Sequence, residues 1–259
     1  MSVLALSSTP TAGVSGPDAL LVNTAGLDLI LPCWNPSDNW VNMLAQHYQE
    51  VQQLMEHVPI QLIVVNDGST QNFTAAQIFQ LETVIPGIIV VNYAANRGKG
   101  YAVREGVKMA RYDLQVYTDL DFPFGVEAVK HAYDKLLSGA DVVAGERGAA
   151  YLDRLPRKRR IITRISRMMN QYVLQLKVAD AQAGLKGFNK YGKAVLLSTK
   201  IDGFLYDSEF MYRAGKSRQL RIAPVTVHCR AGIRFSSFKI KLLLKEFRNY
   251  LRIIAANQG

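Results

Sequence analysis

Residues 60–69 read IQLIVVNDGS, a run of branched apolar side chains that stops at an acidic residue and a glycine. The run 60–66 is typical of a buried β-strand, and Asp67-Gly68 is a turn signal that ends it. Apolar runs of the same kind recur on both sides along the chain, at 27–32, 87–92, 113–118 and 140–144. The stretch therefore predicts one of five strands of a sheet.

Helical periodicity fills the intervals between these runs. Residues 37–57 open on Ser37, a candidate N-cap, and place apolar side chains such as Trp40 and Leu44 at helical spacing. Further helices are predicted over 73–84, 99–110 and 125–137. Strands that alternate with helices form βαβ units, so the sequence predicts an α/β fold with a mainly parallel central sheet.

A polar or glycine-containing cluster follows each predicted strand. In parallel α/β sheets, ligands gather at the carboxyl ends of the strands. The five clusters occupy residues 33–35, 67–70, 96–99, 119–121 and 146–147. Five consecutive strand ends of this kind predict one composite binding site.

Composition limits the class of protein. The 259 residues, 49% hydrophobic and 20% charged, suit one large α/β domain over 26–259 behind a flexible N-terminal tail over 1–25. The two cysteines, Cys33 and Cys229, lie in no metal-ligand spacing, so we expect neither a zinc site nor a disulfide framework. No run of 18 apolar residues occurs, so no membrane-spanning helix is expected. A cytoplasmic setting is the default, and any membrane attachment is expected to be peripheral.

The net charge of +10 comes from two segments. Residues 147–177 carry nine Lys or Arg against one Asp, and residues 230–252 carry seven against one Glu. Such segments attract phosphates, whether of nucleic acid, anionic lipid or a small molecule. Each contains a predicted amphipathic helix, over 157–176 and over 240–254.

The helix over 157–176 divides its side chains between two faces. Its apolar face is formed by Ile161, Ile165, Met168, Tyr172 and Leu176, and its basic face by Arg160, Arg164 and Arg167. The basic face is either solvated, or in contact with an acceptor phosphate or an anionic membrane surface. For the C-terminal helix, core packing and membrane contact both stay open.

Asp119-Leu120-Asp121, directly after a hydrophobic strand, is the sharpest chemical signal. Two carboxylates two positions apart beyond a strand end can flank a divalent cation. Mg²⁺ or Mn²⁺ prefers hard oxygen ligands and leaves coordination sites open for substrate phosphates. A solvated turn is the alternative for an isolated pair of this kind. The position after the fourth strand favours a metal site at Asp119 and Asp121.

Three further segments carry candidate binding groups. Asp67 could accept a hydrogen bond from a nucleotide base or serve a local turn. Residues 96–100, NRGKG, combine glycines that admit a ligand with Lys99 near a helix N-terminus. Asp207 or Glu209 could act as a general base or orient a sugar. Alternatively, Asp207 is the N-cap and Glu209 a first-turn residue of a helix over 208–215.

Taken in order, these segments resemble glycosyltransferase family 2. Residues 31–36, LPCWNP, are similar to its P-x-Y-N opening, and residues 65–69, VNDGS, to its V-D-D-G-S. Residues 96–100 are similar to N-x-G-K-G and residues 119–121 to the metal-binding DxD. The following FPF, residues 122–124, departs from the Gln or Ser that close relatives often place there.

The second half resembles the dolichyl- and polyprenyl-phosphate sugar synthases within that family. Residues 145–147 are similar to their G-S-R, and residues 180–188, DAQAGLKGF, to D-x-Q-x-G-F-K-G-F. Residues 203–209 are similar to G-F-x-x-D-x-E, and residues 225–237 to a degenerate closing segment. The resemblance spans residues 27–240.

The resemblance implies a GT-A nucleotide-sugar-binding fold with a helical C-terminal part, a UDP- or GDP-sugar donor, a divalent metal (Mg²⁺ or Mn²⁺) and inversion at the anomeric carbon. Residues implied at the donor are Pro32, Trp34, Asn35, Asp67, Gly68, Lys99, Asp119, Leu120, Asp121 and Lys186. Residues implied at acceptor or donor phosphates are Arg147, Arg160, Arg164, Arg230 and Arg234. The expected catalytic set is Asp121, Asp207, Glu209 and Arg147.

Three functions stay open at this point. In the first, the acceptor is a lipid monophosphate, already anionic at neutral pH, which needs positioning more than deprotonation. In the second, a glycan hydroxyl is the acceptor, and Asp207 or Glu209 acts as base. The third is a non-catalytic protein that binds phosphate or nucleic acid. Because the basic segments lack interleaved aromatic residues, no nucleic-acid partner is expected.

Overall fold

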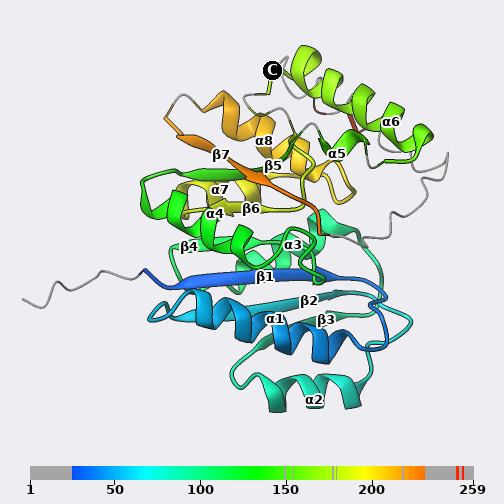
Figure 1. The fold of residues 1–259 in the computed structure, drawn as a ribbon, viewed down its shortest axis with the longest axis vertical. Helices are drawn as coiled ribbons and strands as arrows, with labels where there is room; N and C mark the ends of the chain where they lie inside the picture. The colour runs from blue at the N-terminus through cyan, green and yellow to red at the C-terminus, as the bar shows by residue number, and fades with distance from the viewer. Residues whose placement is uncertain are drawn as a thin grey trace, which may run out of the picture.

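The computed structural model describes residues 25–148, 150–153, 155–176, 178, 180–217, 219–230, 249–250 and 253. The predicted tail over 1–25 and the predicted helix over 240–254 therefore lie almost entirely outside the described residues, as does Arg234. The described part is an α/β fold (Figure 1).

The centre of the fold is a seven-stranded sheet in the order β3-β2-β1-β4-β6-β5-β7. Its strands are β1 (Leu27–Cys33), β2 (Ile60–Asp67), β3 (Ile89–Tyr93), β4 (Leu114–Tyr117), β5 (Val142–Arg147), β6 (Lys186–Phe188) and β7 (Ile222–Val227). All strand pairs are parallel except those of β6, which runs antiparallel to both β4 and β5. The mainly parallel sheet is confirmed, and β6 and β7 add two strands to the five that were predicted.

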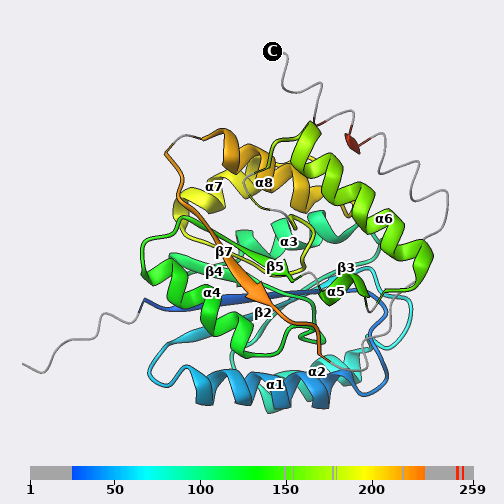
Figure 2. The same cartoon turned by 45° about the horizontal axis from the view of Figure 1, so that its top comes forward.

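Helices cover both faces of the sheet. One face carries α1 (Trp40–Leu54), α2 (Ala75–Val84) and α4 (Glu127–Leu137), and the other carries α3 (Lys99–Lys108), α7 (Lys190–Ser198) and α8 (Tyr206–Lys216). Figure 2 shows the sheet between these two layers. Alternate strand residues feed two cores, because successive side chains of a strand point to opposite faces. In β1, Leu29 packs in the first core and Ile30 in the second.

Beyond β5 the chain leaves the sheet and forms a peripheral helical segment. It comprises α5 (Ala150–Asp153), α6 (Arg157–Met168) and the π-helical turn η1 (Met169–Val173). α6 lies at the outer edge of the molecule in both views (Figures 1 and 2). The helix predicted over 157–176 therefore ends three residues early, where Gln175 adopts a positive φ of 49°.

Three local predictions need correction. β5 extends to Arg147 rather than ending at residue 144, because β7 pairs with it along its whole length. Ser37 is not the N-cap of α1; the helix starts at Trp40, after a turn, and Asn39 precedes it. Asp207 is not an N-cap either, since α8 begins at Tyr206 and the carboxylate lies in its first turn.

Candidate active site

The polar clusters meet at the carboxyl ends of β1, β2 and β4. β1 has β2 on one side and β4 on the other, so the strand order reverses here, as at the ligand-binding crevice of open α/β sheets. Asp119 follows β4 and Lys99 begins α3, and their side chains form an ion pair. The topology thus joins two of the five predicted clusters through a direct contact.

Asp119, Asp121 and Lys99 form the charged centre of the site. Burial raises the pKa of the Asp121 carboxyl, and the neighbouring Asp119 raises it further. Burial opposes the charge on Lys99, but Asp119, Asp207 and Asp121 outweigh it and raise the pKa of the amine. Two mutually repelling carboxylates of this kind favour a bound cation.

Gly184 lets the backbone approach Asp119 and Lys99 closely. A Cβ atom on residue 184 would lie 2.7 Å from Asp119 Oδ2 and 3.2 Å from Lys99 Nζ. A side chain there would therefore occupy space beside a candidate ligand oxygen. Among the described residues, no group of three or more His, Cys, Asp or Glu gathers in a metal-binding arrangement. Asp119 and Asp121 by themselves fit a cation held by two carboxylates, with the other positions left to substrate oxygens and water.

Behind this centre lies a buried polar cluster of Lys186, Asp207 and Tyr117. Lys186 Nζ lies 3.4 Å from Asp207 Oδ1, and the Tyr117 hydroxyl donates to the same carboxylate oxygen. Burial lowers the pKa of the Lys186 amine, although Asp207 opposes this. Burial and Asp207 raise the pKa of Tyr117, which keeps it a neutral donor. Asp207 is therefore held by protein groups from β4 and β6.

The hydrogen bonds of Glu209 are made to groups outside this cluster. Its Oε2 accepts from the backbone amides of Lys200 at 2.9 Å and Ile201 at 2.8 Å. Its Oε1 accepts from Arg213 Nε at 2.8 Å. These bonds fix the loop before α8 to the helix, so the geometry gives Glu209 a structural task.

Asp67 is also saturated by protein donors. Its carboxylate accepts from the Tyr93 hydroxyl at 2.9 Å, the Asn96 amide side chain at 2.9 Å and the backbone amides of Arg97 and Gly98 at 2.8 and 2.9 Å. It thereby shapes the 96–98 loop that leads to Lys99. Gly68 makes this possible, because a Cβ there would collide with the backbone of residues 95–96.

The loop after β1 carries the other residues expected at the nucleoside. Asn35 Oδ1 accepts from the backbone amides of Thr70 and Gln71 at 2.8 and 3.2 Å, which ties this loop to the one after β2. Trp34 beside it is 59% exposed, a large apolar surface open to a planar ligand. Pro32 is buried inside β1, next to Val65 of β2, and shapes the strand end.

Arg147 belongs to a buried ion-pair triad. Its Nε and Nη2 donate to the two oxygens of Asp180 at 2.6 and 2.7 Å, and Nη1 donates to the Tyr151 hydroxyl at 2.9 Å. Arg167 of α6 donates to the same carboxylate at 2.8 Å. Burial would raise the pKa of Asp180, but Arg147 and Arg167 outweigh it and lower the pKa. One carboxylate thus faces two guanidinium groups.

The remaining predicted arginines are spread out. Arg160 donates to the carbonyls of Leu152 and Asp153 at 2.8 Å, at the end of α5, and Arg164 is exposed on α6. Arg230 comes close to the DxD turn from the other side. Its amide donates to Pro123 O at 2.9 Å, and its Nη1 lies 3.0 Å from His47 Nε2.

Phe122 fixes the turn that carries Asp121. It is fully buried, has a positive φ of 46°, and its ring lies 5.1 Å from that of His47. Leu120, between the two aspartates, is buried in the core beneath the same turn. Residues 120 and 122 therefore anchor the turn from inside, which leaves the aspartates at the surface of the site.

The family model of "Glycosyl transferase family 2" matches residues 28–240. This chain belongs to glycosyl transferase family 2. The match covers the sheet from residue 28 onward and every element that supplies the site.

Two curated relatives are similar over part of the chain. Poly-beta-1,6-N-acetyl-D-glucosamine synthase of Staphylococcus aureus (strain COL) is 32% identical over 109 residues, which make up 40% of this chain and 24% of that protein. Bactoprenol glucosyl transferase of Shigella phage SfV is 27% identical over 135 residues, 51% of this chain and 42% of that protein. The chain thus matches less than half the length of each.

Solved structures share the fold. Mannosyl-3-phosphoglycerate synthase from Rubrobacter xylanophilus has a TM-score of 0.63 at 19% identity, over 90% of this chain and 74% of that one. Glucosyl-3-phosphoglycerate synthase from Mycobacterium tuberculosis, in complex with Mn²⁺, UDP-glucose and phosphoglyceric acid, has a TM-score of 0.59 at 15% identity, over 90% and 79%. Both are glycosyltransferases, and the GT-A fold expected for this family 2 chain is confirmed.

Several residues of the site were not assigned a role from the sequence. Tyr117 is indistinguishable from a core strand residue until β4 is placed beside α8. Gly184 and Asp180 lie in the 180–188 motif, which is the signal that the sequence offers for them, and Arg167 belongs to the predicted basic face of the helix. Their roles depend on contacts between segments far apart in the sequence.

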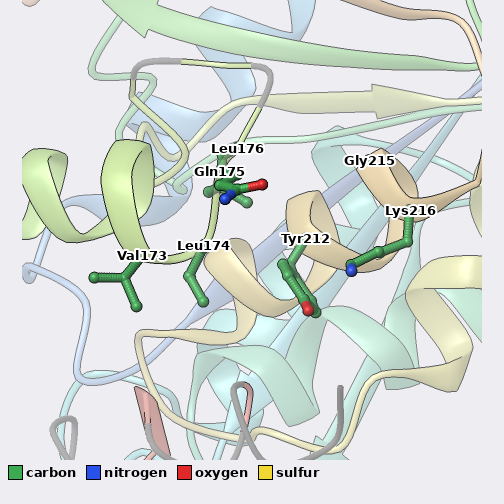
Figure 3. A pocket seen from close by; sticks show the side chains of 7 residues that line it. All are labelled: Val173, Leu174, Gln175, Leu176, Tyr212, Gly215 and Lys216. Carbon is green, nitrogen blue, oxygen red and sulfur yellow. The ribbon is translucent and has the colours of Figure 1, made fainter. Parts of the chain in front are cut away.

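The described residues also form a hollow away from this site. A hollow of about 250 Å³ lies between the end of η1 and α8, lined by Val173, Gln175, Tyr212 and Lys216 among others (Figure 3). None of the predicted site residues lines it, so it is separate from the Asp119–Asp121 centre. No described helix is long and apolar enough to span a bilayer.

Proposed function

We propose that this family 2 enzyme is a divalent-metal-dependent, inverting transferase that moves a sugar from a UDP- or GDP-sugar to a polyprenyl-phosphate acceptor. The observation that carries the proposal is the Asp119–Asp121–Lys99 centre, which packs closely against Gly184. Two carboxylates and one amine at the sheet edge match the needs of a metal-bound diphosphate.

On the donor side, Asp119 and Asp121 would hold the ion. When bound, a divalent cation would neutralise the charge that develops on the departing nucleoside diphosphate. Lys99 sits where it can turn from Asp119 to a phosphate oxygen, and the exposed Trp34 offers a surface for the base. The neighbouring fold from Mycobacterium tuberculosis, which holds Mn²⁺ and UDP-glucose, supports this arrangement.

On the acceptor side, a phosphate needs no general base. Its oxygen forms the new bond to the anomeric carbon as the bond from that carbon to the diphosphate oxygen breaks, and the nucleoside diphosphate leaves with the bonding electrons. Both carboxylates that could have served as base are engaged, Asp207 by Lys186 and Tyr117, and Glu209 by backbone amides. This favours an acceptor that is already anionic.

The Arg147–Asp180–Arg167 triad supports the same acceptor class. Two guanidinium groups share a single carboxylate there, so the cluster keeps a net positive charge that would attract a phosphate. The relative named bactoprenol glucosyl transferase is consistent with a polyprenyl-phosphate acceptor.

A hydroxyl acceptor is the second candidate. The similarity to poly-beta-1,6-N-acetyl-D-glucosamine synthase favours it. With such an acceptor, Asp207 would have to release Tyr117 before it could accept a proton. A double variant of Asp207 and Glu209 distinguishes the two: persistent turnover supports the phosphate acceptor, whereas complete loss in a folded protein supports a base and a hydroxyl.

The proposal is tested first at the donor. Thermal unfolding is followed with a panel of UDP- and GDP-sugars, with and without Mn²⁺, for the wild type, Asp121→Ala and the control Asp134→Ala, an exposed carboxylate on α4. A ligand that binds only the folded state raises the midpoint. We expect one nucleotide class to raise it in the wild type and the control, and only with metal.

Loss of that shift in Asp121→Ala would place the donor and metal at the DxD turn. No shift with any donor, or an equal shift without metal, would overturn the metal-dependent donor site. Radiolabelled sugar transfer to short polyprenyl phosphates, compared with polyprenols and glycan oligomers, then tests the acceptor. Transfer to a hydroxyl acceptor alone would contradict the phosphate assignment.

A further inference from the structure

α6 is amphipathic, but its polar side faces the protein and its apolar side faces outward. Its inner side is polar: Ser166 donates to Gln182 at 2.8 Å, Arg167 pairs with Asp180, and just beyond it the buried Asn170 accepts from the Tyr250 hydroxyl at 2.6 Å. None of its twelve residues is buried. The helix is thus attached to the protein by hydrogen bonds and ion pairs rather than by apolar packing.

Its apolar side faces outward. Successive helical residues are about 100° apart, so Ile161, Ile165 and Met168 fall within about 60° of one another, on the side away from Ser166. They are 58%, 52% and 57% exposed, and Tyr172 extends the row at 69%. Single exposed apolar residues are common on proteins, but an aligned row along a helix marks a contact surface.

Cations flank this row and no acid interrupts it. Arg157 and Lys158 are exposed on either side of the row, and the twelve residues of α6 contain six Lys or Arg and no Asp or Glu. A second copy of the chain would bring two such helices together, with twelve like charges around the contact. An anionic surface with an apolar interior complements both features at once.

We propose that the outward face of α6, formed by Ile161, Ile165, Met168 and Tyr172, docks on the surface of an anionic lipid bilayer. The helix would lie in the plane of the interface, with its apolar row among the acyl-chain ends and its cations at the headgroups. Because Arg167 and Ser166 on the inner side contact residues 180–182, the docked helix would sit next to the loop that contains Gly184 and borders Asp119.

The inference extends the proposed function, since a polyprenyl-phosphate acceptor resides in a membrane, but its test needs neither donor nor turnover. The full chain is sedimented with vesicles of phosphatidylcholine, with or without a quarter of phosphatidylglycerol. The wild type is expected to bind the anionic vesicles at least about tenfold more tightly, because the cations of α6 are attracted to the negative potential of such a surface.

Two kinds of variant separate the apolar and the basic contributions. Ile161→Ser with Ile165→Ser is expected to lower anionic vesicle binding at least about tenfold, since two apolar side chains no longer enter the interface. Arg157→Gln with Lys158→Gln is expected to reduce the preference for anionic over neutral vesicles about tenfold. The matched control is Phe79→Ser, which removes an apolar side chain 72% exposed on α2.

Thermal midpoints and circular dichroism show that each variant is folded, which is expected because all the altered side chains are exposed. Equal vesicle binding by the wild type and the Ile161/Ile165 variant would overturn the proposal, as would an equal loss in the Phe79 control. A wild type that ignores vesicles but forms a dimer, with a monomeric double variant, would assign the row to a second copy instead. Neither result changes the outcome of the donor-binding test, so the two proposals are tested independently.

Discussion

Substitution of Asp180 by Asn removes the charge that holds Arg147 and Arg167 together. The carboxylate accepts three ion-pair hydrogen bonds from the two guanidinium groups, at 2.6, 2.7 and 2.8 Å, and a weaker one from the Arg147 amide at 3.2 Å. An amide of the same shape keeps one acceptor oxygen but turns an NH₂ toward a cation. Two largely buried positive charges then face each other without a counter-ion.

The expected cost follows from this arrangement. Removing one partner of a buried ion pair costs about 3–5 kcal/mol, because the remaining charge stays desolvated and unpaired. For a chain of this size, each kcal/mol lowers the thermal midpoint by about 2–4 °C. We therefore expect Asp180→Asn to lower the midpoint by about 6–20 °C at neutral pH.

The pH dependence has a defined sign. The folded-state pKa of Asp180 lies below its unfolded value, so the ionised carboxylate stabilises the fold fully above a pH of about 4. That contribution is lost as the pH falls through the folded-state pKa. The difference in unfolding free energy between wild type and variant should therefore be constant from about pH 5 to 8 and shrink in more acidic solution.

Urea unfolding at several pH values measures this difference directly. The control is Asp134→Asn, which breaks the exposed Lys130–Asp134 pair on α4 and should cost less than about 1 kcal/mol. A cost for Asp180→Asn no larger than the control's, or a difference that grows toward acid pH, would refute the reasoning that this triad is a net stabilising, charge-paired unit.

Two other substitutions test the site. Gly184→Ala puts a methyl group 2.7 Å from Asp119 Oδ2, so metal-dependent donor affinity should fall at least about tenfold. Gly215→Ala, which has open space around its Cβ, is the control and should leave the affinity unchanged. Calorimetric titration measures both affinities, and equal values would contradict the close approach of Gly184 to Asp119. Glu209→Gln accepts hydrogen bonds from two backbone amides and Arg213 less strongly, so the free energy of unfolding should fall by about 1–3 kcal/mol while metal-dependent donor binding persists. Loss of donor binding without loss of stability would instead support a catalytic role for Glu209.

The sequence alone was sufficient to predict strands β1 to β5 and the position of the DxD turn. Short branched runs such as 60–66, separated by helical periodicity, leave few alternatives to a parallel α/β sheet, because both signals are local. The turn signal at Asp67-Gly68 and the pair Asp119 and Asp121 are local too. Their meeting at one edge follows from the parallel arrangement, in which the carboxyl ends of the strands coincide.

Antiparallel β6 could not be foreseen in this way. Its three residues, Lys186–Phe188, are too short for a periodicity, and they join the sheet only because β4 and β5 leave a place between them. Lys186 reaches Asp207 as a consequence of that insertion. The segment lies within the 180–188 motif, but nothing local in the sequence gives the direction of the strand.

The roles of the individual charges were decided by the tertiary structure. From the sequence, Asp67, Glu209 and Arg147 are all candidates for ligand contact, since a charged side chain after a strand or at a helix start is available until its partners are known. In the folded protein, backbone amides donate to the carboxylates of Asp67 and Glu209, and Arg147 donates to Asp180. It also turns the apolar row of α6 outward. Amphipathicity is a property of the sequence, but which face meets the protein depends on long-range contacts, here the polar ones of Ser166 and Arg167.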